Sequence, residues 1–170
     1  MLGKRDAVVI ATAMPHPPPR LRSFGRSGDA AACLRIWRRA AEAGHPFLGP
    51  RDLDQEELLL RHRLLPAADV TLAEVDGVPV GFVALVWRLV AALFVDPAHH
   101  RHSIGRHLLE HAAQAHPALA VEVYEDNANA RAFYAACGFR QVGRRPQDAL
   151  GRPHALLQLE RAFADTRARR

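Results

Sequence analysis

The stretch from Leu93 to Leu109 constrains the fold more than any other part of the chain. An apolar, β-prone run ends at Pro97, because proline has no N–H for a sheet ladder, and a polar loop leads into an amphipathic helix. Four apolar residues share one face of that helix: Ile104, Leu108, Leu109 and Ala112. The first N–H groups of such a helix lack partners within it, and with the helix dipole they form an anion site suited to a diphosphate.

The chain has 170 residues, of which 49% are apolar, and this is enough for one domain with a substantial core. Patterning divides it into a proline-rich extension over 1–19, a folded domain over 20–162 and a charged tail over 163–170. Domain-like patterning begins only after Met14, which is therefore a second candidate start of the chain. No apolar run approaches the ~20 residues of a membrane span, so we expect no association with membranes.

Charge and cysteine content narrow the class of protein further. The net charge is +5, but the basic residues, all but one of them arginine, are spread along the chain. We therefore expect attraction for a polyanionic cofactor rather than nucleic-acid binding. Two cysteines, Cys33 and Cys137, do not make a disulfide framework; we expect both to be buried, in a reducing cytoplasm. The loop histidines His99, His100 and His102 lack the spacing of a zinc site, so we expect no metal.

Strand and helix patterns alternate along the rest of the chain. Asp76-Gly77 between two β-rich runs is a hairpin signal, while Asn127 and Gly138 are suited to begin and end a helix. We expect strands over 20–24, 70–75, 80–86, 89–95, 118–124, 139–145 and 154–162. We expect helices over 29–43, 54–64, 103–115 and between Asn127 and Gly138.

Two motifs in this sequence resemble those of the GNAT superfamily of acyl-CoA N-acyltransferases. The first, V-x-P-x-x-[QR]-x-x-G-x-[GA], matches Val95 to Gly105, with Ser103 at its first glycine and His100 at its Gln or Arg. The second, N-x-x-A-x-x-F-Y-x-x-x-G-F, matches at Asn127, Ala130, Phe133, Tyr134, Gly138 and Phe139. The order and separation of the motifs are also those of the superfamily, and the resemblance covers residues 20–162.

Within the superfamily the chain is similar to a small bacterial branch. The shared features are Trp37, the loop His45–Leu48, Leu65-Pro66 and the segment Asp148–Pro153. The resemblance implies an α+β fold with a mixed, mostly antiparallel sheet that is splayed between its fourth and fifth strands, and about four helices. The cofactor would lie in the splay.

The resemblance also implies an acetyl-CoA-dependent N-acetyltransferase that acts on a primary amine of a small molecule or a protein lysine, by direct attack in a ternary complex. Residues 100–105 would hold the pyrophosphate, Val95 would pair with the pantetheine arm, and an N–H near Leu93 would stabilise the oxyanion. The cofactor-binding residues implied are Leu93, Phe94, Val95, His100, Arg101, His102, Ser103, Ile104, Gly105, Arg106, Asn127, Ala130 and Tyr134.

Proton transfer needs an acid for the leaving thiolate and a base for the amine. A phenol is a plausible donor to a thiolate, and Tyr134 stands at the family's acid position. The branch usually carries an acidic residue on the fourth strand, where this chain has Ala91. Glu122, His45 or a water chain are the alternatives for the base.

Ala91 and Ser103 leave a second interpretation open: an acyl-CoA-binding module with weak or lost catalysis that acts as a sensor or partner protein. The loop around His45, the second helix and the turn before the last strand would select the acceptor, which the sequence does not identify. We expect a monomer or a homodimer.

Overall fold

The computed structural model describes residues 18–162. Met14, the predicted tail and all but the last two residues of the predicted extension lie outside this range. The strands are β1 (Arg20–Ser23), β2 (Asp69–Val75), β3 (Val78–Val86), β4 (Leu89–Val95), β5 (Ala118–Tyr124), β6 (Arg140–Arg145) and β7 (Leu156–Ala162). The helices are α1 (Asp29–Gly44), α2 (Pro50–Leu59), α3 (Leu65–Ala67), α4 (Ile104–Ala115) and α5 (Ala128–Ala136), with a π-helical turn at Leu60–Leu64 and a 3-10 turn at Pro97–His99.

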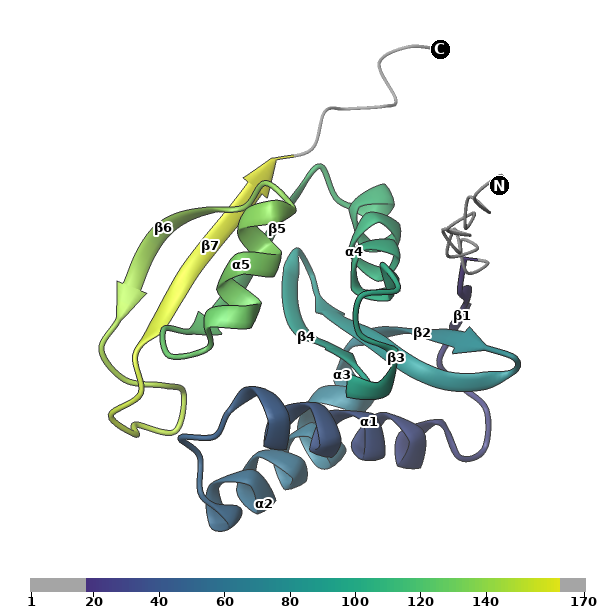
Figure 1. Cartoon of the computed structure of the whole chain (residues 1–170), viewed down its shortest axis with the longest axis horizontal. Coiled ribbons are helices and arrows are strands. Elements are labelled where there is room, and N and C mark those ends of the chain that lie inside the picture. The colour runs from purple at the N-terminus through teal and green to yellow at the C-terminus, as the bar shows by residue number, and fades with distance from the viewer. Residues whose placement is uncertain (1–17, 163–170) are drawn as a thin grey trace, which may run out of the picture.

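The strands form one sheet in the order β1-β2-β3-β4-β5-β7-β6. Neighbouring strands are antiparallel except β4 and β5, which run parallel and pair only at Leu89 with Ala120 and at Val90 with Val121. Beyond these two pairs the strands diverge, which opens the sheet between them (Figure 1). The predicted mixed sheet with a splay between the fourth and fifth strands is confirmed.

Helices cover both faces of the sheet (Figure 1). On one face α4 and α5 pack over the strands, with Leu108 and Leu109 of α4 in the centre of a hydrophobic cluster. On the other face α1, α2 and the π-helical turn enclose a second cluster that contains Ile36, Leu72 and Phe82. Among residues 18–162, no helix combines the length and apolar character that crossing a membrane requires.

The second helix begins four residues earlier than predicted, at Pro50 instead of residue 54. Proline fits the first helical position, because the N–H it lacks has no partner there anyway. The carboxylate of Asp52 accepts a hydrogen bond from the Gly49 N–H (3.2 Å), which stabilises this start. The predicted hairpin is confirmed, with Asp76 and Gly77 at φ angles of 51° and 77° as a tight two-residue turn requires.

A buried ion triad joins β1, α1 and β2. The guanidinium of Arg22 donates to both oxygens of Asp29 (2.8 Å each) and to Glu74 (2.5 Å), and these side chains are only 11%, 4% and 2% exposed. Asp29 also accepts from the N–H groups of Gly25 and Arg26 ahead of α1. The hydrogen bonds from Arg22 hold the pKa of both carboxyl groups below their ordinary values.

Gly81 of β3 allows the start of α4 to lie directly on the sheet. A Cβ atom at this position would be 3.1 Å from the Phe94 carbonyl oxygen and 3.3 Å from side-chain carbons of Ile104 and Val95. These neighbours are backbone or packed side chains, so they cannot move aside cheaply. The close approach places the first turn of α4 against β3 and β4.

We expect Gly81→Ala to lower the free energy of unfolding by about 1–3 kcal/mol, because the added methyl overpacks this contact. Urea unfolding measures the change. Gly49→Ala is the matched control, since a Cβ there makes an ordinary contact at 3.6 Å and φ is −76°; its effect should stay below about 1 kcal/mol. Equal unfolding midpoints for the two variants would show that α4 tolerates displacement.

Candidate active site

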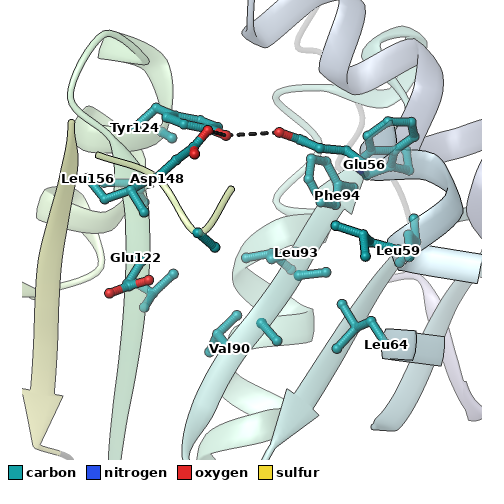
Figure 2. A pocket seen from close by; sticks show the side chains of 18 of the residues that line it. Glu56, Leu59, Leu64, Val90, Leu93, Phe94, Glu122, Tyr124, Asp148 and Leu156 are labelled. Atoms are coloured by element: carbon teal, nitrogen blue, oxygen red, sulfur yellow. Dashed lines mark hydrogen bonds between the residues drawn. The ribbon is translucent and has the colours of Figure 1, made fainter. Parts of the chain in front are cut away.

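A cavity of about 610 Å³ occupies the opening between β4 and β5. Its walls come from both strands, from α1, α2 and the π-helical turn on one face, and from α5 and the loop before β7 (Figure 2). The predicted splay is therefore open space rather than packed side chains. Among the predicted site residues, Leu93, Phe94, Asn127, Ala130, Tyr134, Glu122 and His45 line the cavity.

The backbone of β4 directs free donors into this opening. The Asp96 N–H donates to Val80 O of β3 (2.8 Å), and alternate residues of a strand point their N–H groups the same way. The N–H groups of Leu93 and Val95 therefore point away from β3, toward the cavity. The Val95 carbonyl, on the same side, accepts a hydrogen bond from His100 Nε2 (3.0 Å).

Residues 100–106 form the loop and the first turn of α4, where the sequence predicts an anion site. The first bond within the helix runs from the His107 N–H to Ser103 O (3.0 Å), so the N–H groups of Ile104, Gly105 and Arg106 have no partner inside it. Ser103 adopts a left-handed conformation (φ 58°), as does Arg101 (φ 67°). Three adjacent backbone donors, the helix dipole and two flanking arginines fit a diphosphate.

Tyr134 of α5 reaches the cavity from the face that carries the anion site. Its ring packs edge-on against Phe133 and Phe139, with centroids 5.1 and 5.2 Å away. Burial raises the pKa of the phenol above its ordinary value, so the group is protonated at neutral pH, as a proton donor must be. Asn127 begins α5 as predicted, because its Oδ1 accepts from the Ala130 N–H (2.9 Å).

The two candidate bases lie in different environments. Glu122 of β5 is part of the cavity wall (Figure 2), and its carboxylate pairs with Arg145 of β6 (3.2 Å) and accepts from Gln158 Nε2 of β7 (3.0 Å). The ring of His45 packs against Phe47 and Tyr124, with centroids 5.6 and 5.1 Å away. Burial lowers the pKa of this histidine, which favours neutral imidazole.

Sequence reasoning missed a polar cluster at the α2 end of the cavity, formed by Glu56, Tyr124, Asp148 and Arg152. The Tyr124 hydroxyl donates to Glu56 Oε1 (2.9 Å), as Figure 2 shows, and Arg152 Nη2 donates to both groups. Arg152 Nε also donates to Asp148. The motif around Asp148 and Arg152 was visible in the sequence, but nothing in it connected either residue to α2.

Comparisons with known proteins agree with this geometry. The model of the acetyltransferase (GNAT) family matches residues 30–139. The peptidyl-lysine N-acetyltransferase YjaB of Salmonella typhimurium is 38% identical over 135 residues, which cover 79% of this chain and 92% of that protein. The peptidyl-lysine N-acetyltransferase YiaC of Escherichia coli is 37% identical over 123 residues, which cover 72% of this chain and 84% of that protein.

The fold has a similar counterpart among solved structures. The solution structure of apo-form YjaB from Escherichia coli superimposes with a TM-score of 0.76 at 36% identity, and the match covers 85% of this chain and 98% of that one. The chain therefore belongs to the acetyltransferase (GNAT) family. Its predicted class, a GNAT N-acetyltransferase that takes its acyl group from acetyl-CoA, is confirmed.

Proposed function

We propose that the protein acetylates the side-chain amine of lysine residues in other proteins, by direct attack of the amine on the thioester of acetyl-CoA. One observation supports the proposal: a single cavity in the opening between β4 and β5 reaches from Tyr134 on α5 to Glu56 on α2. Both reactants can therefore meet in one space. The activities in the names of YjaB and YiaC support lysine as the acceptor.

Backbone groups of this chain would hold the donor. The N–H groups of Ile104, Gly105 and Arg106 bind the diphosphate, and the N–H of Val95 pairs with the pantetheine arm as a neighbouring strand would. When bound, acetyl-CoA supplies an activated acetyl group. The N–H of Leu93 points into the opening and stabilises negative charge on the acetyl oxygen.

Two side chains move protons in this scheme. Tyr134 donates to the sulfur as it leaves, because a protonated phenol beside a thiolate is a suitable acid. Glu122 is the base for the ammonium, directly or through water, since it is part of the cavity wall on β5, across from β4 (Figure 2). His45 is the weaker candidate, because its ring is enclosed by Phe47 and Tyr124 and its Nδ1 is buried without a partner among residues 18–162.

Release of CoA thiol from acetyl-CoA tests this function. The acceptors are a lysine peptide with both ends blocked, a lysine-free peptide with a free amino terminus, and a small diamine. We expect thiol release with the blocked lysine peptide, and a matching mass increase of one acetyl group on its side chain. Tight binding of acetyl-CoA with no release in the presence of any of these amines would favour the alternative, an acyl-CoA-binding module.

A further inference from the structure

Glu56 is held in the cavity by only one of its two carboxylate oxygens. The Tyr124 hydroxyl (2.9 Å) and Arg152 Nη2 both donate to Oε1. No described residue donates a hydrogen bond to Oε2, and Glu56 is part of the cavity wall (Figure 2). The carboxylate is thus fixed on one side and open on the other.

The support for this carboxylate is itself rigid. Asp148 is 3% exposed and accepts from Arg152 Nε, while its other oxygen accepts from the N–H groups of Leu150 and Arg152 (2.9 Å each). The loop before β7 therefore presents the guanidinium in one orientation. Tyr124 is fixed in turn between the rings of His45 and Phe47. A carboxylate positioned in this way loses little freedom when it binds a ligand.

The charge of this end of the cavity favours a cation. Three carboxylates, Asp52, Glu56 and Asp148, surround the single guanidinium of Arg152, whose Nη1 is 3.5 Å from Asp52. The four side chains together carry two more negative charges than positive ones. Arg63 lines the cavity about two helical turns beyond Glu56, on the π-helical turn. Since Arg152 already occupies Oε1, the unsatisfied charge is available at Oε2.

The wall between Glu56 and β4 is apolar. Leu59 and Leu64 face Phe94 and Leu93 across this part of the cavity (Figure 2). A chain of methylene groups can pack along such a wall while its charged end stays at a carboxylate. The combination suits a primary ammonium on a flexible alkyl stem, and it does not suit a neutral aromatic amine.

We propose that Oε2 of Glu56 binds the protonated side-chain amine of the acceptor lysine, with Tyr124 and Arg152 as positioning residues. The assignment rests on the proposed function, because it names the group that selects the acceptor of that reaction. Glu56 receives the charged amine at the α2 end of the cavity. The amine then loses its proton on the Glu122 side before it reacts.

Calorimetric titration of two blocked pentapeptides into the CoA-loaded enzyme tests the assignment. One peptide has a central lysine and the other a central norleucine, which keeps the alkyl stem and removes the charge. We expect Glu56→Gln to weaken binding of the lysine peptide by roughly 10- to 100-fold and to leave the norleucine peptide unchanged, because a charged hydrogen bond is lost.

Glu57→Gln is the matched control. Its carboxylate is on the same helix, but it pairs with Arg38 (3.4 Å) and Arg61 (3.3 Å) and is not part of the cavity wall. We expect both peptides to bind this variant as they bind the wild type. Unchanged melting temperature and CoA affinity in Glu56→Gln would show that the variant is folded.

Three results would overturn the assignment: equal binding of the two peptides by the wild type, equal losses for both in Glu56→Gln, or no loss for the lysine peptide. The first needs no variant, so the test stands even if Glu56→Gln does not fold. Thiol release is measured separately. Glu56-dependent binding of the lysine peptide without thiol release would support the assignment and refute the proposed function. Acetylation of the lysine peptide with binding that does not depend on Glu56 would support the proposed function and refute the assignment.

Discussion

Replacement of Tyr134 with phenylalanine should slow acetyl transfer by roughly 100- to 1000-fold, the usual worth of a well-placed general acid. The variant keeps the ring, which packs against Phe133 and Phe139, and removes only the hydroxyl. Without a proton donor the thiolate must leave as an anion between the walls of the cavity. Steady-state thiol release gives the loss in kcat, and calorimetry should show acetyl-CoA binding close to that of the wild type.

The chain's other tyrosine provides the control for this prediction. Tyr124 also lines the cavity, but its hydroxyl is bound to Glu56 and Arg152 at the α2 end. We expect Tyr124→Phe to raise the KM for the lysine peptide more than it lowers kcat. If the Tyr134→Phe enzyme turns over within about tenfold of the wild-type rate, Tyr134 is not the general acid.

Replacement of Arg22 with glutamine should cost about 3 kcal/mol or more of unfolding free energy. Removing one partner of a buried ion pair leaves an uncompensated charge, and here Asp29 loses its guanidinium while nearly excluded from solvent. Chemical denaturation at pH 7 measures the loss. Arg38→Gln is the control, because its partners Asp54 and Glu42 are 65% and 56% exposed, and such surface pairs contribute less than about 1 kcal/mol.

The contribution of Arg22 to the free energy of unfolding should decrease as the pH falls. Arg22 lowers the pKa of Asp29 and Glu74 in the folded protein, so the unfolded chain binds protons more readily than the folded chain does. The stabilisation is fully present above about pH 4, the ordinary range of carboxyl groups, and declines as the pH falls below it. The wild type and Arg22→Gln should therefore differ most near neutral pH and converge in acid. A constant difference from pH 7 to pH 3 would contradict this account.

Local signals in the sequence were sufficient for most of the fold. The segment from Val95 to Gly105 predicted a strand, a loop and the start of a helix, because proline, a small residue and glycine each restrict or free the backbone at their own position. Asn127 at the start of α5 and the Asp76-Gly77 turn follow the same logic. Cys33 and Cys137 are both buried, as expected for small apolar residues in a helix and beside one.

The remaining features depend on contacts between distant parts of the chain. Glu56 forms hydrogen bonds with Tyr124 and Arg152, which lie 68 and 96 residues away in the sequence. The periodic spacing of apolar residues does not predict contacts over such separations. The π-helical turn at Leu60–Leu64 was also unpredicted, since its residues read as an ordinary continuation of α2. The motifs thus predicted candidate residues for donor binding and acid catalysis. The cluster around Glu56 became visible only when α2, β5 and the loop before β7 were brought together.

The two-residue pairing of β4 with β5 has a consequence for aggregation. An unpaired strand edge normally invites the strand of another molecule, which is a hazard for a soluble protein. Here the unpaired edge of β4 lies in the opening between β4 and β5, with the walls of the cavity on either side of it. A strand from another molecule meets these walls before it can pair with β4, while the N–H groups of the edge stay accessible to a slender ligand that carries amide groups.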